Sequence, residues 1–209
     1  MKNKTTNSDP FIVPIFPEAV LYAQQINADS NKIINYLKKT EFEKTANSYD
    51  EKADCYMSKN INVFKDLNFL KKEINKHVGF YLNKLFQYKM NYKITTSWAT
   101  KINYKGYGQK HTHSNCILSG VYYPIGNKDF KISFHKKHET AWDIVVNQDN
   151  EFNSKKIIFE IKNNNTLILF PSYLTHSINV NNSNTTRYSI AFNVNPKGLI
   201  GEKDNAIVF

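Results

Sequence analysis

The feature that most limits the possible folds is a series of short β-rich segments in the second half of the chain. From about residue 93 onward, segments rich in β-branched and aromatic residues alternate with polar turns of Asn, Gly, Lys and Asp. The expected strands are 94–104, 116–124, 130–135, 142–146, 155–161, 165–170, 174–180 and 186–195. Short strands separated by polar turns predict a β-sandwich or barrel, of which the double-stranded β-helix, or jelly roll, is one form.

The first half of the chain has a different pattern. Residues 29–41 predict a helix capped by Asp29 or Ser30, and 67–87 predict a longer one. The longer helix has apolar residues at three- and four-residue steps, namely Leu70, Ile74, Val78, Tyr81 and Leu85. Residues 11–25 are expected to be extended, and 42–65 irregular.

The fold class is therefore α+β and mainly β, with helices against one side of a β core. We expect a single domain over 1–209, because 209 residues suit one hydrophobic core. Within it, 1–92 would be an N-terminal extended segment with supporting helices. Residues 93–200 would form the catalytic core.

Composition excludes some classes of protein. The net charge is +10, but the lysines are spread through the chain without a dense basic block, so a nucleic-acid partner is not expected. No stretch of about 18 apolar residues predicts a membrane span. The polar N-terminus lacks the apolar core of a signal peptide. Cys55 and Cys116 have no metal-binding or redox spacing, which favours a reducing cytoplasm. The sequence does not indicate an oligomeric state.

Three histidines lie in strand-like surroundings. His111 and His113 stand in GQKHTHSN, and alternate residues of a strand face the same side, so both imidazoles can reach one site. His176 stands in LILFPSYLTHSI, where an apolar strand is followed by a tight connection. Three protein ligands on one face of an octahedral metal leave three positions free, as in non-heme Fe(II) oxygenases. His135 and His138, in a turn-like segment, are expected to face solvent or substrate.

Arg187 is the only arginine of the chain, which otherwise uses lysine for its basic residues. It stands in NTTRYSIAFN, an alternating segment that predicts a strand. Arginine grips a carboxylate with two parallel hydrogen bonds and keeps its charge when desolvated, which lysine does less well. We expect Arg187 to hold the far carboxylate of a 2-oxo acid that chelates the metal. Ser189, on the same face of that strand, can donate a second hydrogen bond.

Residues 97–193 resemble the Fe(II)/2-oxoglutarate-dependent oxygenases. They are most similar to a family of 2-oxoglutarate–iron oxygenases common in marine phages and bacteria, distantly related to prolyl 4-hydroxylases. The stretches that carry the resemblance are SWATK (97–101), KHTHSN (110–115), LSGVYYP (118–124), LFPSYLTHSI (169–178) and TRYSIAFN (186–193).

This resemblance implies a jelly-roll core, with iron held by His111, His113 and His176. It implies 2-oxoglutarate held by Arg187, Ser189 and a tyrosine of LSGVYYP, taken as Tyr123. Dioxygen would be the other cosubstrate. The reaction would convert 2-oxoglutarate to succinate and carbon dioxide while a substrate C–H bond becomes an alcohol. The cytoplasm would be that of a bacterium or of a phage-infected cell.

The resemblance also makes an amino-acid side chain the expected target. A peptidyl proline is the first candidate, and the alternatives are another side chain in a peptide, a free amino acid and a small metabolite. Several residues on the strand leading to the histidine pair are candidates for the substrate mouth: Trp98, Thr100, Lys101, Asn103 and Tyr104. Most members of the superfamily have Asp or Glu where this chain has His113. The neutral imidazole leaves the ferrous site one charge unit more positive.

Three other functions share parts of this pattern. A cupin-type three-histidine metalloprotein would not use 2-oxoglutarate, but the usual glutamate after the histidine pair is missing, where Ile117 and Leu118 stand. A nucleic-acid demethylase of the same superfamily would have two arginines after the distal histidine, and this chain has one. A non-catalytic jelly-roll binding module would be indifferent to metal and 2-oxoglutarate.

Overall fold

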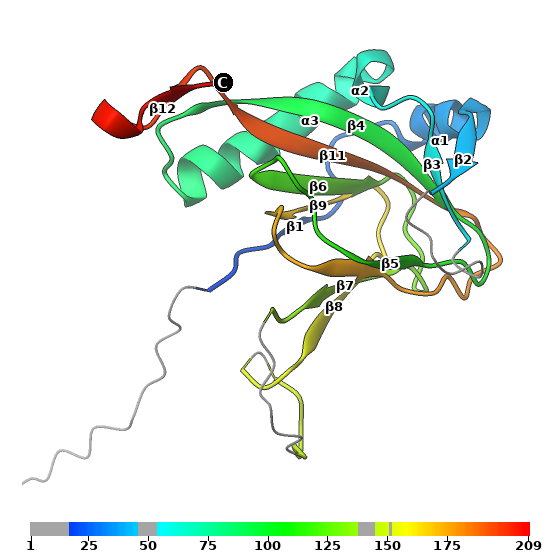
Figure 1. The fold of residues 1–209 in the computed structure, drawn as a ribbon. Coiled ribbons are helices and arrows are strands. Elements are labelled where there is room, and N and C mark those ends of the chain that lie inside the picture. The colour runs from blue at the N-terminus through cyan, green and yellow to red at the C-terminus, as the bar shows by residue number, and fades with distance from the viewer. Residues whose placement is uncertain (1–16, 46–53, 138–144, 151) are drawn as a thin grey trace, which may run out of the picture.

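The computed structural model describes residues 17–45, 54–137, 145–150 and 152–209. Two sheets face each other, and helices cover the outer face of the larger one (Figure 1). The larger sheet has the order β1-β9-β6-β11-β4-β3-β2, and the smaller one β5-β10-β7-β8. The strands that pair in these sheets are antiparallel. This two-sheet architecture is the predicted jelly roll.

The larger sheet consists of β1 (Leu21–Ala23), β2 (Phe42–Lys44), β3 (Cys55–Ser58), β4 (Asn91–Ile102), β6 (Leu118–Tyr123), β9 (Thr166–Pro171) and β11 (Arg187–Lys197). The smaller sheet consists of β5 (Gly108–His111), β7 (Lys131–His135), β8 (Lys156–Glu160) and β10 (His176–Ile178). A separate hairpin pairs β12 (Leu199–Ile200) with β13 (Ile207–Val208), flanking the 3₁₀ turn Lys203–Asn205.

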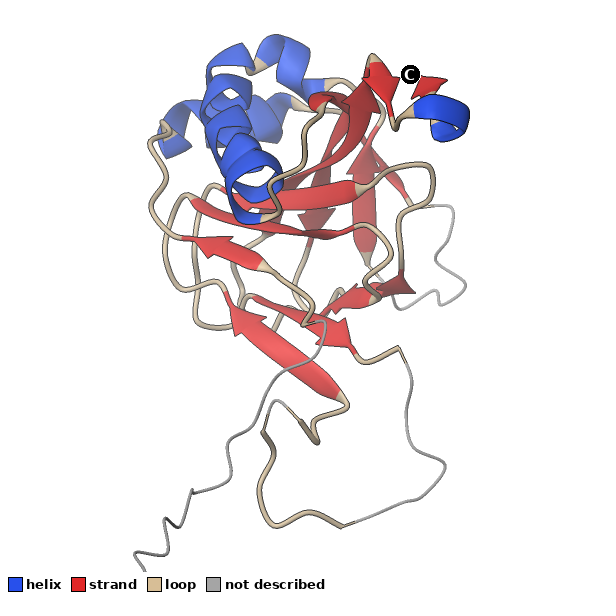
Figure 2. Cartoon of the chain, turned by 90° about the vertical axis from the view of Figure 1, so that its left-hand side faces the viewer, coloured by secondary structure: helices blue, strands red, loops and turns tan. Residues whose placement is uncertain are grey.

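The helices gather on one side of the larger sheet (Figure 2). They are α1 (Ser30–Lys39), α2 (Val63–Asp66) and α3 (Asn68–Gly79), which continues as a π-helical segment, Phe80–Leu85. Asp29 caps α1 by accepting a hydrogen bond from the Lys32 amide, as its sequence position predicts. None of the helices in the described ranges is long and apolar enough to cross a membrane.

Two apolar clusters hold these layers together. One lies between the helices and the larger sheet and includes Leu37, Leu70 and Phe192. The other lies between the two sheets and includes Phe130, Phe134 and Phe170. Strands β6 and β9 are buried along their whole length because they face both clusters. Apolar packing on both faces of these central strands thus stabilises the jelly-roll core.

The structure corrects several expectations for the first half of the chain. Residues 42–65 were expected to be irregular, but their described part contains β2, β3 and the start of α2, while 46–53 lie outside the described residues. Leu85, placed on the buried face of a regular helix, is half exposed, because the α-helix ends at Gly79 and the wider π turns rotate the following residues. Of the expected strand 142–146, residues 145–146 are not a strand, and the rest lies outside the described residues.

Candidate functional site

The two histidine-bearing segments meet in the smaller sheet. Strands β5 and β10 are antiparallel neighbours, and His111 pairs directly with His176. Their ring centroids lie 4.3 Å apart. His113 is not on the same strand as His111, since β5 ends at His111, but its ring centroid still lies 5.1 Å from that of His176. Strand alternation was expected to bring both imidazoles to one site. The segment that follows β5 brings His113 there instead.

The three imidazoles form a compact group of potential metal ligands. One nitrogen from each of His111, His113 and His176 lies within 4.8 Å of the others. The Nδ1 atom of His111 lies 2.8 Å from the Gln109 carbonyl oxygen, and Nδ1 of His176 lies 3.0 Å from that of Leu174. A carbonyl oxygen only accepts, so each Nδ1 donates and each Nε2 keeps its lone pair. Such backbone contacts commonly orient metal-binding histidines.

Burial keeps two of these rings neutral. Desolvation, with a smaller contribution from the charge of His111, lowers the pKa of His113 to about 4. Desolvation, with smaller contributions from the charges of other histidines, also lowers the pKa of His176 to about 3, although the hydrogen bond with Leu174 acts in the opposite direction. Both imidazoles are therefore unprotonated at neutral pH, the state in which histidine binds metal.

Aromatic side chains surround the group. The ring centroid of Phe170 lies 4.6 Å from that of His176, and the ring centroid of Trp98 lies 5.7 Å from that of His113. These contacts restrict the imidazole orientations and exclude water from one side. The donor set, neutral nitrogen ligands that converge in a partly dry corner, fits a ferrous ion.

Arg187 is buried behind Tyr123. Its side chain is 1% exposed, its Nη1 donates to the Lys131 carbonyl oxygen at 2.9 Å, and its Nη2 donates to the Tyr123 hydroxyl at 3.2 Å. Its Nε has no hydrogen-bond partner, and no carboxylate forms an ion pair with it in the described part of the chain. A buried guanidinium with an unused donor and no counter-ion fits an anionic ligand.

The two tyrosines of the LSGVYYP segment face opposite ways. Tyr123 lines the site and meets Arg187, whereas the Tyr122 hydroxyl donates to the Asn165 side chain on the helix side. Burial raises the pKa of Tyr123 despite the opposing effect of Arg187, so its hydroxyl stays protonated. It can therefore serve as a hydrogen-bond donor to a carboxylate.

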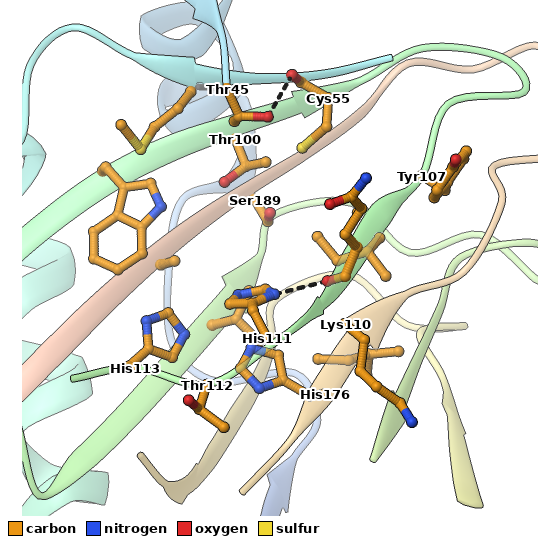
Figure 3. Close-up of a pocket in the computed structure, with 18 of the residues that line it drawn as sticks. Thr45, Cys55, Thr100, Tyr107, Lys110, His111, Thr112, His113, His176 and Ser189 are labelled. Carbon is orange, nitrogen blue, oxygen red and sulfur yellow. Dashed lines mark hydrogen bonds between the residues drawn. The ribbon is translucent and has the colours of Figure 1, made fainter. Parts of the chain in front are cut away.

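The histidines open into a cavity of about 680 Å³ between the two sheets (Figure 3). Tyr123 and Ser189 also line it. Arg187 does not line the cavity itself but lies one layer behind, in contact with Tyr123. Ser189 lies two residues along β11 on the same buried face as Arg187, as predicted. A ligand extending from the histidines toward Arg187 would pass Tyr123 and Ser189.

The cavity also includes residues that sequence reasoning missed. Thr45, Cys55 and Met57 line it, so the N-terminal region contributes to the site and does not only support the core. Cys55 and Met57 are on β3, which pairs with β4 at the edge of the jelly roll. The alternation in CYMS is too short to predict a strand, which is why this wall was not foreseen.

The candidates on β4 divide between its two faces. Trp98 and Thr100 line the cavity. Lys101 lies on the opposite face, where its Nζ is 4.8 Å from the Tyr56 ring centroid, and Tyr104 is exposed. Asn103 donates to the Asp54 carboxylate and is not a cavity residue. His135 contacts the Ser177 hydroxyl at 2.8 Å, and His138 lies outside the described residues.

A family model and the three-histidine site together indicate an oxygenase of the non-heme iron, 2-oxoglutarate-dependent class, which uses Fe(II), 2-oxoglutarate and dioxygen. The family described as "Putative 2OG-Fe(II) oxygenase" matches residues 96–193, a little under half of the chain. The matched residues include His111, His113, His176, Arg187 and the central strands. A search of curated proteins found no match to the chain.

Solved structures share the fold. A 2OG-Fe(II) oxygenase family oxidoreductase from Burkholderia pseudomallei has a TM-score of 0.59 at 10% identity, covering 84% of each chain. HygX from Streptomyces hygroscopicus, with nickel and 2-oxoglutarate bound, has a TM-score of 0.60 at 8% identity, covering 86% of this chain and 83% of that one.

A prolyl hydroxylase from Trichoplax adhaerens, in complex with a hypoxia inducible factor peptide fragment, has a TM-score of 0.58 at 10% identity. The alignment covers 84% of this chain and 82% of the hydroxylase. At such low identity these likenesses establish the jelly-roll fold alone.

Proposed function

We propose that this oxygenase hydroxylates an amino-acid side chain, with Fe(II) held by His111, His113 and His176. Arg187, Tyr123 and Ser189 hold 2-oxoglutarate in the same proposal. The observation that carries it is one cavity lined by three histidines whose nitrogens can bind a metal and by Tyr123, with a buried arginine behind Tyr123 that has no carboxylate partner among the described residues. When bound, iron and 2-oxoglutarate supply the oxidising chemistry that converts a C–H bond to an alcohol.

The protein's own residues provide binding, orientation and dryness. The carbonyl oxygens of Gln109 and Leu174 fix the ring tautomers of His111 and His176. Tyr123, kept protonated by burial, can donate to the same carboxylate as Arg187. Phe170 packs against His176 and Trp98 against His113, which shields these two histidines from water. The positions of these side chains and carbonyl groups in the described structure are compatible with each of these roles.

A peptidyl proline is our first candidate substrate, supported by the prolyl hydroxylase of the same fold, whose structure contains a peptide fragment. A small molecule is the alternative, since HygX has been solved with hygromycin B bound. Likeness of fold does not fix the substrate, so both remain proposals for this chain. The enzyme class does not depend on which is right.

The test is an anaerobic titration of the purified apoprotein, first with Fe(II) and then with 2-oxoglutarate. We expect the visible charge-transfer band of a chelated iron complex, and its loss in His113→Ala. Iron binding without the band would contradict the proposed 2-oxoglutarate site and favour a cupin-type metalloprotein. Absence of both metal and 2-oxoglutarate binding would favour a non-catalytic binding module.

A further inference from the structure

The described part of the cavity wall has almost no charge. Apart from the three histidines, Lys110 is the one basic residue among the described residues that line it, and neither Asp nor Glu is among them. Lys110 is exposed, and its amine points away from the histidines (Figure 3). The described residues of the cavity wall therefore offer no carboxylate to a cationic group.

One row of residues on the larger sheet is apolar. Trp98 on β4 pairs with Ala191 on β11, and Ala191 pairs with Val121 on β6, so the three side chains point to the same face. All three line the cavity. Trp98 also contacts His113, with ring centroids 5.7 Å apart. The small Ala191 between two larger residues leaves a shallow apolar recess beside the proposed metal ligands.

The neighbouring row carries hydroxyl groups. Thr100 pairs with Ser189 on one side and with Met57 on the other, and all three line the cavity. This row is two residues closer to Arg187 along β11, and it suits the polar 2-oxoglutarate. The cavity thus has a hydroxyl-bearing part toward Arg187 and an apolar part beside His113.

We propose that the row Trp98, Ala191 and Val121 is the subsite for an uncharged, apolar part of the primary substrate, and that cationic substrates are rejected. The inference rests on the proposed function, because it assumes that metal and 2-oxoglutarate occupy the rest of the cavity. A cation there would lose its hydration without gaining a carboxylate partner. The buried Arg187 and a divalent metal bound by neutral imidazoles would also repel it.

The experiment uses two probes of similar size, N-acetyl-leucine amide and Nα-acetyl-lysine amide, at millimolar concentration. Binding is measured anaerobically as a shift of the Fe(II)–2-oxoglutarate band. It is also measured as a change of Trp98 fluorescence in the zinc-loaded Trp142→Phe variant, since the chain has two tryptophans. We expect the leucine probe to bind at least about tenfold more tightly than the lysine probe.

Equal binding of the two probes, tighter binding of the lysine probe, or no binding of either would overturn the inference. Failure of the proposed function has a different signature, because the Fe(II)–2-oxoglutarate band would then not form before any probe is added. The two failures are therefore distinguishable in one titration.

Three variants sharpen the test. Ala191→Leu fills the recess and should abolish binding of the leucine probe while the band persists. Met57→Glu, at the edge of the sheet, should strengthen binding of the lysine probe by about tenfold even if Ala191→Leu fails to fold. Lys110→Ala is the control and should leave the ranking of the probes unchanged. A changed ranking in Lys110→Ala, or unaltered lysine-probe binding in Met57→Glu, would contradict the proposed subsite.

Discussion

Arg187 donates a hydrogen bond from Nη2 to the Tyr123 hydroxyl at 3.2 Å, and the two side chains form one buried unit behind the cavity. The guanidinium also lies over the Tyr123 ring, with Cζ 5.1 Å from its centroid. Within the described residues, this cation has no carboxylate partner. A ligand carboxylate that meets Tyr123 would therefore satisfy the charge of Arg187 as well.

The first prediction concerns Arg187→Lys. A lysine keeps the positive charge but loses the planar pair of donors, so 2-oxoglutarate should bind roughly 10- to 100-fold more weakly. Fe(II) affinity should change little, because Arg187 does not contact the histidines. Anaerobic titration that follows metal binding and the charge-transfer band separately measures both constants. Equal 2-oxoglutarate affinity in both proteins would refute the proposed role of the only arginine.

The second prediction concerns the third ligand. His113→Ala should weaken Fe(II) binding by roughly 100-fold or more, because a ligand is lost and not merely misoriented. His113→Asp should bind Fe(II) more tightly than His113→Ala, since a carboxylate is an effective ligand and lowers the positive charge of the site. Isothermal titration of the three proteins with Fe(II) under anaerobic conditions gives the comparison. Wild-type affinity in His113→Ala would exclude His113 as a ligand.

The third prediction is a pH dependence of the apoprotein's stability. The pKa values of His113 and His176 fall to about 4 and about 3 on folding, so below the usual histidine pKa the unfolded chain binds more protons. The free energy of unfolding should therefore be highest above pH about 6.5 and decrease as the pH falls toward 4. The decrease amounts to at most about 3 kcal/mol for each histidine.

Urea unfolding of the metal-free protein at several pH values measures this decrease. A variant with both His113→Gln and His176→Gln should lose most of it. Glu160 affects stability in a separate, lower pH range. Lys162 and Lys131 lower its pKa to about 2, so its contribution to the free energy of unfolding declines only below the ordinary glutamate pKa. A decrease of the same size in the double variant would mean that other groups cause it.

Much of the β core was predictable because its strands are long or fully buried. The alternation around Arg187 predicted β11, and the apolar segment before Pro171 predicted β9. Strands β2, β3 and β5 are only three or four residues long, and GQKH has no apolar alternation at all. Their existence depends on pairing with other strands, β2 with β3, β3 with β4 and β5 with β10, which no local pattern reveals.

The residues of the candidate site likewise divide into those that the sequence predicted and those that it did not. His111, His113, His176 and Arg187 stood out because of residue type and spacing. The structure brings the three histidines together and places Arg187 behind Tyr123, a residue of the cavity wall. Cys55 and Met57 did not stand out, because only the placement of β3 beside β4 directs them into the cavity. A sequence therefore predicts the residues whose rare type carries the chemistry, but it does not predict which common residues line the cavity.

The last prediction concerns a buried hydroxyl pair that joins the two ligand-bearing turns. Ser119 Oγ lies 2.9 Å from Ser172 Oγ and donates to Asn193 Oδ1 at 2.9 Å, and both serines are 1% exposed. The Ser172 carbonyl oxygen in turn accepts a hydrogen bond from the His113 amide at 2.9 Å. Ser172 therefore connects the turn that leads to His176 with the segment that carries His113.

Ser119→Ala removes both hydroxyl contacts and leaves the Asn193 oxygen without its donor. The free energy of unfolding should fall by about 1–3 kcal/mol, and Fe(II) should bind several-fold more weakly because His113 is less firmly held. The affinity of the metal-loaded protein for 2-oxoglutarate should be nearly unchanged. Ser177→Ala is the matched control, since it removes a single contact to His135 beside His176 but none to the His113 segment. Equal losses of Fe(II) affinity in both variants would show that the hydroxyl pair stabilises the fold without positioning His113.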